Sequence, residues 1–353
     1  MIFKDTFYRV CNCQVSLFSF LSYLVDWLTY FIVLSAAVNW QLFAVTRYTD
    51  FSINDISIMH AYKAENETYA PVWYLLILIL LIPLFIVVIC CLWFLRNRNK
   101  KRMLWDMHAA ILGSLGCCSS QLLLVVIIKN IAAVPRPDFL TRCQPDYSTI
   151  PVLGSLYNVD FCQNPDESLI NDGFKSFPSG HSSTVFASQT FLVLFLIGKI
   201  KMSGSSYFSW KLVLSIMYPL IISCKVSFSR VSDHRHRVRD VLVGDLIGVC
   251  FGTLFYFIYF TNPFNGAPSL AFSPRKFEVD ENSEGLFGLK ISTYDIDSKE
   301  ISYTESVDDG NNPAFPKSFS PLCYSTVPVK LKHTFNNRPN RPTSNPIGSL
   351  FYV

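Results

Sequence analysis

The stretch VWYLLILILLIPLFIVVICCLWFL, residues 72–95, contains no charged residue and decides the fold. It is longer than the roughly 20 residues that a helix needs to cross a hydrocarbon core about 30 Å thick. Five further apolar runs occur before residue 261, at 27–45, 107–128, 183–200, 210–228 and 241–260. Six such runs separated by polar segments are not typical of a water-soluble core. The sequence therefore predicts an all-α bundle of six membrane-spanning helices.

These predicted spans divide the chain into three parts. Residues 1–26 are expected to form an N-terminal cytoplasmic or juxtamembrane segment, residues 27–260 the helical domain, and residues 261–353 a cytoplasmic tail. The tail is rich in Pro, Asn, Ser, Asp and Glu without a sustained period, so we expect it to be disordered. Because residues 1–14 lack the basic-then-apolar layout of a cleavable signal peptide, the first span is expected to act as the anchor.

The distribution of lysine and arginine predicts how the bundle is oriented. The cluster RNRNKKR, residues 96–102, is expected to be cytoplasmic, as are both chain termini. The loops 46–71, 129–182 and 229–240 then lie on the other side, together with the glycosylation sequon that begins at Asn66. The last of these loops is strongly basic, against the usual charge bias, and a bound anion would explain why.

The eleven cysteines show no spacing that is typical of a metal site. Most of them lie in apolar runs, where cysteine behaves as a small hydrophobic residue: Cys90, Cys91, Cys117, Cys118, Cys224 and Cys250. Cys143 and Cys162 are instead the two that fall in the outer loops, on the side that is oxidising in secretory compartments. We therefore predict a disulfide between them.

Three polar clusters lie at span ends on this outer side: KNIAAVPRP (129–137), FPSGHSS (177–183) and SFSRVSDHRHRVRDVLVG (227–244). Lys129, Arg136 and Arg230 supply fixed positive charge and donors that match phosphate oxygens. Ser179 and Gly180 add a hydroxyl and an amide at the start of a helix, where anions bind readily. The ligand that these groups predict is a single tetrahedral oxyanion.

The histidines of the clusters could carry out chemistry on such an anion. His236 and Asp240 share a helix face, so the carboxylate could hold one ring nitrogen while the other attacks phosphorus. His181, on another helix, would act as the general acid. Taken singly, each feature has an ordinary explanation, as a helix cap, a turn or a contact with lipid headgroups. Their combination on one membrane face favours a phosphatase site, and without a carboxylate-rich cluster we expect no metal or other cofactor.

The clusters also resemble the three-part signature of the type-2 phosphatidate phosphatases, or lipid phosphate phosphatases, in the order Lys129-x6-Arg136-Pro137, Pro178-Ser179-Gly180-His181, Ser229-Arg230-x5-His236-x3-Asp240. The resemblance covers roughly residues 46–260. The segments DFSINDISIMHAY and PRPDFLTRCQPD are most similar to the fungal branch that includes diacylglycerol pyrophosphate phosphatase. This resemblance implies a helical fold related to vanadium haloperoxidases and bacterial acid phosphatases.

The resemblance further implies a magnesium-independent hydrolase for phosphatidate, diacylglycerol pyrophosphate and lysophosphatidate. It assigns a phosphohistidine-forming nucleophile, its orienting carboxylate and a general acid to His236, Asp240 and His181. It assigns phosphate binding to Lys129, Arg136, Ser179, Gly180 and Arg230.

Other functions remain open from the sequence. They are a phosphatase for sphingoid-base phosphates or isoprenyl diphosphates, a non-catalytic relative that binds lipid phosphates, and a transporter, although the ionisable residues crowd one membrane edge instead of a midplane path. Expected partners are lipid phosphates and the bilayer, with no nucleic acid, and a homo-oligomer is left open. The expected location is the vacuole, Golgi, ER or plasma membrane, with the site on the lumenal or extracellular side.

Two charged features stand outside the motifs. Arg237 and Arg239 follow His236, either to attract an anionic headgroup or second phosphate or to meet lipid headgroups. Lys225 and Asp245 lie within predicted spans, where an unpaired charge costs roughly 2.5–3.5 kcal/mol. We predict an ion pair between them, and the alternative is that Lys225 reaches the outer surface alone.

Overall fold

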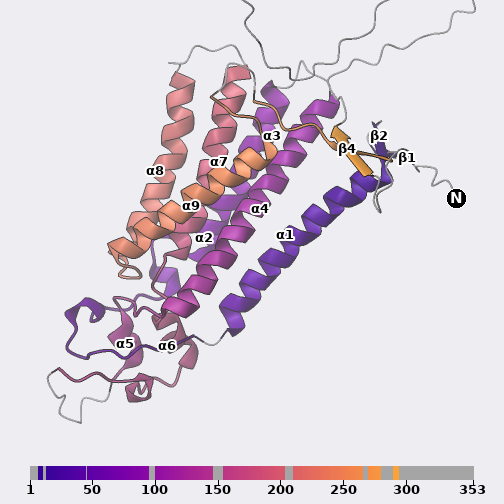
Figure 1. Cartoon of the computed structure of the whole chain (residues 1–353). Helices are drawn as coiled ribbons and strands as arrows, with labels where there is room; N and C mark the ends of the chain where they lie inside the picture. Colours follow the sequence, from indigo (N-terminus) through magenta and orange to yellow (C-terminus); the bar gives the residue numbers. More distant parts are fainter. Residues whose placement is uncertain are drawn as a thin grey trace, which may run out of the picture. The chain divides into compact units, whose positions relative to one another are not determined.

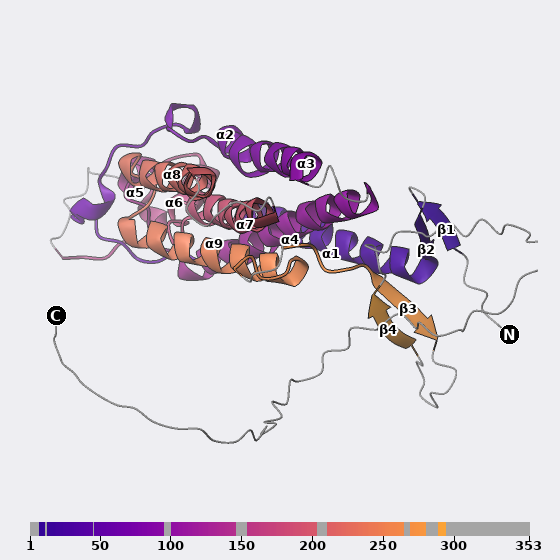
Figure 2. The same ribbon diagram turned by 90° about the horizontal axis from the view of Figure 1, so that it is seen from above.

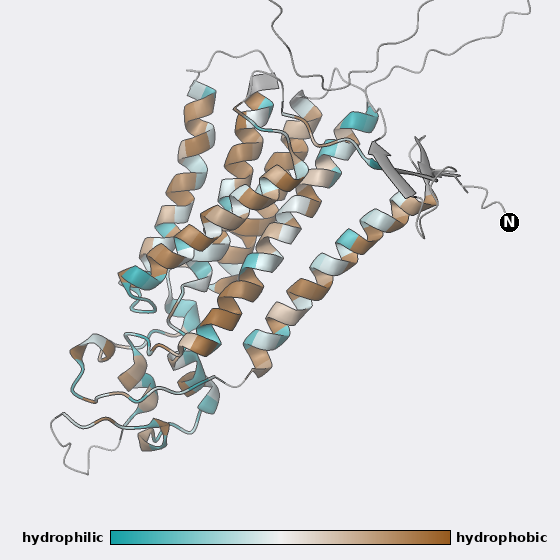
Figure 3. Cartoon of the chain, in the orientation of Figure 1, coloured by the Kyte–Doolittle hydropathy of each residue, from teal (hydrophilic) through white to brown (hydrophobic). Residues whose placement is uncertain are grey.

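The computed structural model describes residues 7–10, 13–44, 46–94, 100–145, 154–202, 210–264, 269–279 and 289–293, all within the unit Met1–Lys299. Its long helices are α1 (Leu17–Phe43), the continuous α2, η3 and α3 (Val72–Leu76, Ile77–Leu81, Ile82–Phe94), α4 (Lys100–Ala132), α7 (Gly180–Met202), α8 (Trp210–Ser232) and α9 (Val238–Tyr259). Six helices are long and apolar enough to cross a membrane, which confirms the predicted helical bundle. Figure 1 shows these helices side by side, and Figure 3 shows apolar residues along their length.

The first helix begins earlier than the sequence suggested. It starts at Leu17, so the predicted N-terminal segment 1–26 already contains the first turns of α1. These turns include Asp26, whose carboxylate pairs with Arg275. A partner distant in sequence thus offsets the charge.

The shorter elements lie at opposite ends of the bundle (Figures 1 and 2). One end carries α5 (Phe139–Cys143), α6 (Glu167–Gly173) and the 3₁₀ turns η1 (Ile56–Ile58), η2 (Glu65–Glu67) and η4 (Val159–Phe161). The other end carries two antiparallel hairpins that were not predicted, β1 (Phe7–Val10) with β2 (Cys13–Ser16) and β3 (Arg275–Val279) with β4 (Leu289–Thr293).

Helix α7 is the centre of the bundle. It packs against α4, α8 and α9. Of the 18-residue apolar stretch of α7, 78% is buried, against 6% for that of α1. Close approach to α9 requires glycine, because a Cβ at Gly248 would lie 2.4 Å from the carbonyl oxygen of Ser183. Gly252 meets the Ala187 carbonyl of α7 in the same way, and Gly244 meets the carbonyl of Ser179, the residue before α7. This contact fixes the spacing of the two helix starts that carry predicted site residues.

Polar side chains of α7 bond the backbone carbonyl groups that have no helical partner near Pro83. Proline has no N–H, so the carbonyl of Ile79, four residues earlier, loses its usual partner. The Ser188 hydroxyl donates to that carbonyl at 2.9 Å, and the Gln189 amide donates to the Leu78 carbonyl at 2.9 Å. The π-helical segment η3 covers both carbonyls, as expected where side chains enter a helix ladder.

The chain beyond residue 260 continues to pack against the bundle. Asp106 forms buried ion pairs with Lys199 and Arg102, and its Oδ1 accepts from the Ala271 amide at 3.2 Å. The Arg102 guanidinium also donates to the Ala271 carbonyl. The packed part therefore extends past the predicted start of the tail, whereas residues 294–353 lie outside the described part of the chain.

The predicted ion pair between Lys225 and Asp245 is wrong. The Ser227 hydroxyl donates to Asp245 at 2.8 Å, while the Lys225 ammonium lies 5.0 Å from the ring centroid of Tyr69. Lys225 is exposed, and its side chain extends toward Tyr69, in the segment before α2. Its long stem makes this possible, as the alternative explanation proposed.

Candidate active site

The three motif segments meet at a cavity of about 320 Å³, at the end of the bundle that carries α5 and α6. Six of the eight predicted site residues line it: Lys129, Arg136, Gly180, His181, Arg230 and His236. The remaining two, Ser179 and Asp240, are buried behind the wall. The motifs thus converge in space as predicted, although two residues have other contacts than expected.

Three cationic side chains of the cavity are fixed by hydrogen bonds that use only some of their N–H groups. Arg136 donates from Nε to the Asp172 carbonyl at 2.9 Å and from one terminal nitrogen to the Asp172 carboxylate at 2.8 Å. Arg230 pairs with Asp233 at 3.1 Å, and Lys129 donates to the Lys175 carbonyl at 3.2 Å. All three are at most 7% exposed. Each keeps N–H groups for an anion that enters the cavity.

Asp172 organises the cations, and sequence analysis missed it. Its second carboxylate oxygen accepts from Arg142 at 2.9 Å, and Arg142 in turn pairs with buried Asp138. Burial alone would raise the pKa of Asp172, but the guanidinium groups of Arg136 and Arg142 hold it well below its usual range. Asp172 lies near the end of the short helix α6, outside the three motifs, so only its spatial position identifies it.

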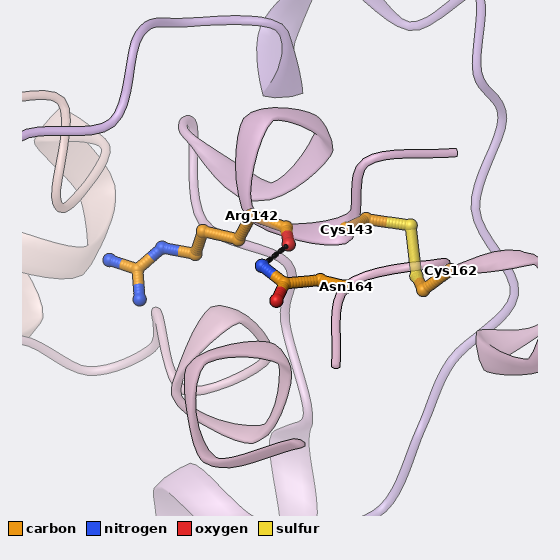
Figure 4. The surroundings of a disulfide bond; sticks show 4 residues. All are labelled: Arg142, Cys143, Cys162 and Asn164. Atoms are coloured by element: carbon orange, nitrogen blue, oxygen red, sulfur yellow. Dashed lines mark hydrogen bonds between the residues drawn. A yellow bond between two sulfur atoms is a disulfide. The ribbon is translucent and has the colours of Figure 1, made fainter. Parts of the chain in front are cut away.

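The disulfide lies beside this network. Cys143 and Cys162 are joined, with Cα atoms 4.6 Å apart, which confirms the prediction. Asn164 donates to the Arg142 carbonyl at 2.7 Å, so the cross-link fixes the backbone next to Arg142 (Figure 4). The covalent bond therefore supports the Arg142 to Asp172 to Arg136 chain of ion pairs.

His236 is positioned by a backbone carbonyl. Its Nδ1 lies 2.6 Å from the Ser176 oxygen, and a carbonyl can only accept, so Nδ1 carries the proton. Nε2 is then unprotonated in the neutral ring. Burial first, and then the charges of Arg136 and Lys129, hold the pKa of His236 well below its ordinary value. The low pKa favours the neutral ring, in which Nε2 carries a free lone pair.

Asp240 does not make the expected contact with the His236 ring. Its Oδ2 accepts from the Ser176 hydroxyl at 2.6 Å and from the Arg237 amide at 3.0 Å. A carboxylate in the first turn of α9 is well placed to bond nearby backbone N–H groups, which explains the second contact. Ser176 thus connects Asp240 to His236, since its hydroxyl meets one and its carbonyl the other. In the sequence, Ser176 could have been suspected as a site residue from its position two residues before Pro178 of the second motif.

Helix α7 presents its N-terminus to the cavity. Gly180 is its first residue, and the Lys129 ammonium would lie 3.7 Å from a Cβ at this position. The His181 Nε2 atom is buried without a hydrogen-bond partner among the described residues. Ser179 is completely buried, and its hydroxyl is 3.5 Å from the Ser182 amide. Ser179 therefore caps the helix, and Gly180 and His181 face the ligand space.

One wall of the cavity is apolar and comes from α2 and α4, with side chains of Val72, Leu75, Leu122, Val125 and Val126. Cations at the floor and aliphatic side chains at the wall suit a ligand with an anionic group attached to an apolar body. An inorganic anion would use the first part only.

Comparison with known proteins agrees with this geometry. Residues 108–264 match the model of the PAP2 superfamily. The chain is 37% identical over 207 residues, 58% of its length, to probable diacylglycerol pyrophosphate phosphatase 1 of Schizosaccharomyces pombe, 70% of which is covered. It is 27% identical over 207 residues, 58% of its length, to diacylglycerol pyrophosphate phosphatase 1 of Saccharomyces cerevisiae, 69% of which is covered.

A third relative is lipid phosphate phosphatase 1 of Arabidopsis thaliana, 36% identical over 167 residues, which are 47% of this chain and 49% of that protein. No solved structure matches the chain. The matched segment contains all three clusters that form the cavity. By this match and by the likeness to the fission yeast protein over most of that protein's length, the chain belongs to the PAP2 superfamily.

Proposed function

We propose that this protein is an integral membrane phosphatase that hydrolyses phosphatidate, diacylglycerol pyrophosphate and lysophosphatidate. The observation that carries the proposal is the cavity in which Lys129, Arg136 and Arg230 surround neutral His236, with His181 beside it. The apolar wall supports a lipid as the body of the substrate, and the names of the relatives support lipid phosphates as its class.

The first step forms a bond between His236 Nε2 and phosphorus. The bond from phosphorus to the leaving oxygen breaks, its electron pair stays on that oxygen, and His181 supplies a proton. Nδ1 keeps its proton throughout, donated to the Ser176 carbonyl, so the positive charge that develops on the ring is stabilised locally. In the second step water attacks the phosphohistidine, His181 takes a proton from this water, and inorganic phosphate leaves.

The cations carry the electrostatic part of this mechanism. Negative charge on the transferred phosphoryl oxygens is met by Lys129, Arg136 and Arg230, which are fixed before substrate binds. These charges balance a phosphate dianion without a divalent ion, so we propose a magnesium-independent reaction.

We place the site on the lumenal or extracellular side of an endomembrane or plasma membrane. The cavity shares its end of the bundle with the disulfide and with exposed Asn66 in η2, while the basic start of α4 is at the other end. A glycan on the wild type that is absent from Asn66→Gln supports this orientation. Proteolytic cleavage of the 46–71 loop from the cytosolic side of sealed vesicles would contradict it.

The function is tested with full-length protein in detergent, EDTA and radiolabelled lipid phosphates. We expect turnover in EDTA, and an acid-labile labelled intermediate in the wild type that His236→Ala lacks. The alanine variant should lose several orders of magnitude in kcat, as nucleophile variants do. Unchanged turnover by His236→Ala would contradict the proposed nucleophile, and loss of turnover in EDTA would contradict metal-independent chemistry.

A further inference from the structure

We propose that Arg235 forms a second phosphate subsite beside the nucleophile, which binds the inner phosphate of a lipid diphosphate while the outer phosphate reacts. The inference rests on the proposed function and specifies its substrate class. It gives a task to a cation that the motif does not include.

Arg235 lies in the same cavity as the motif cations and is 5% exposed. One terminal nitrogen donates to the Lys63 carbonyl at 2.7 Å and lies 3.6 Å from the Glu65 carboxylate. Its other terminal nitrogen is 3.9 Å from Asp172. These contacts orient the guanidinium but leave part of its hydrogen-bonding capacity unused. Its Nε atom has no hydrogen-bond partner within the described chain.

The position of Arg235 favours the leaving-group side of the reaction. Arg235, His181 and His236 all line the same cavity. His181 is the proposed proton donor to the leaving oxygen, so a cation that shares its cavity can bind an anionic group of the leaving part of the substrate. The Nε–H group and the terminal N–H groups that remain without partners can donate hydrogen bonds to phosphate oxygens there.

The two other arginines of the stretch serve different purposes. Arg237 donates to the Pro135 carbonyl at 2.8 Å and to the Ser57 hydroxyl at 3.1 Å, which ties neighbouring loops together. The Arg239 side chain is 66% exposed and 3.6 Å from Asp240. Of the three arginines in residues 227–244 that the motif does not include, Arg235 is therefore the one that lines the cavity.

A diphosphate and a monophosphate use this subsite differently. When the bond to the outer phosphorus of a diphosphate breaks, the electron pair moves to the bridging oxygen and the inner phosphate gains charge that Arg235 stabilises. With phosphatidate the leaving group is an uncharged diacylglycerol once His181 has delivered its proton, and no phosphate remains for Arg235. Loss of Arg235 should therefore discriminate between the two substrates.

The test compares kcat/KM for dioleoyl diacylglycerol pyrophosphate and dioleoyl phosphatidate in mixed micelles, using full-length protein. We expect Arg235→Gln to reduce kcat/KM for the diphosphate at least about 10-fold more than for phosphatidate, since one good charged hydrogen bond is of that size. Arg235→Lys, which keeps the charge but loses the fork, should lie between. The matched control is Arg239→Gln, which should leave the ratio unchanged.

A second measurement does not depend on turnover of lipid. The inhibition constant of inorganic pyrophosphate should rise in Arg235→Gln and Arg235→Lys, while that of orthovanadate, which needs one subsite, stays near wild type. Equal losses on both lipids, or an unchanged pyrophosphate constant, would overturn the subsite. Absence of wild-type activity on both lipids would instead overturn the proposed function itself.

Discussion

At the scale of single residues, the least expected contact is the one between Asp240 and Ser176. The motif suggests a direct hydrogen bond between Asp240 and His236. In the structure Ser176 lies between them, since its hydroxyl donates to Asp240 and its carbonyl accepts from His236. Asp240 thus fixes the backbone that in turn selects the protonated nitrogen of His236. Ser176 is a positioning residue in this arrangement.

Removing the Ser176 hydroxyl tests this arrangement, because Ser176→Ala retains the carbonyl that meets His236. A hydrogen bond to a charged group contributes roughly 1.5–3 kcal/mol, so we expect kcat to fall about 10- to 100-fold with little change in KM. Asp240→Asn should cost much less in the Ser176→Ala background than alone, as a double-mutant cycle measures. Additive losses would show that Asp240 acts without Ser176.

The pH profile of kcat/KM reports the protonation of His236 in the free enzyme. Its low pKa keeps the ring neutral, so the acid limb should fall well below pH 6.5. Arg136→Gln removes a positive charge that disfavours the imidazolium, so the pKa rises and the acid limb moves to higher pH. Measuring both enzymes on one substrate cancels the titration of the lipid phosphate. A limb that stays in place or moves down would contradict this assignment.

At the scale of elements, the spacing of α7 and α9 determines whether His181 and His236 can flank one phosphate. His181 is the second residue of α7, and His236 lies two residues before the start of α9. Glycines let the two helices approach until backbone meets backbone. Sequence could identify both helices, but not that their glycine faces meet, because an apolar run does not specify its neighbour.

Gly248→Ala tests the importance of this spacing. The added Cβ would overlap the Ser183 carbonyl, and overpacking of this kind costs roughly 1–3 kcal/mol. We expect a lower thermal unfolding temperature in detergent and a lower kcat, since the histidines move apart. Leu246→Phe adds volume to the same helix at a side chain that is 63% exposed, and it should leave both quantities near wild type. Equal effects of the two changes would argue against a special role of this contact.

At the scale of the whole molecule, the two ends have separate tasks. One end holds the cationic cavity, and the other holds the buried ion pairs of Asp106 and the strand that follows α9. The sequence predicted the six spans and the convergence of three motifs, because long apolar runs and motif spacing are local signals. It did not predict Asp172, Ser176 and Ala271 as partners, because these contacts depend on tertiary proximity alone.

Lys199→Met separates stability from catalysis. It leaves Asp106 with Arg102 and the Ala271 amide, and breaking one partner of a buried ion pair typically costs about 3–5 kcal/mol. We expect a clear fall in the thermal unfolding temperature with KM unchanged, because the cavity is at the opposite end. Lys211→Met removes the same charge from an exposed position and should have little effect on either. A raised KM in Lys199→Met would show that the two ends are coupled.

The contact between Ala271 and Asp106 has a consequence for biosynthesis. Arg102, Asp106 and Lys199 belong to the third and fourth spans, yet the backbone groups of Ser269 and Ala271 that complete their bonding are translated after the sixth. When the third and fourth spans are inserted, the chain that supplies these backbone groups has not yet been synthesised. The three charged side chains therefore lack these partners at that stage. Final consolidation of this end of the bundle is therefore a late step, which follows insertion of every helix.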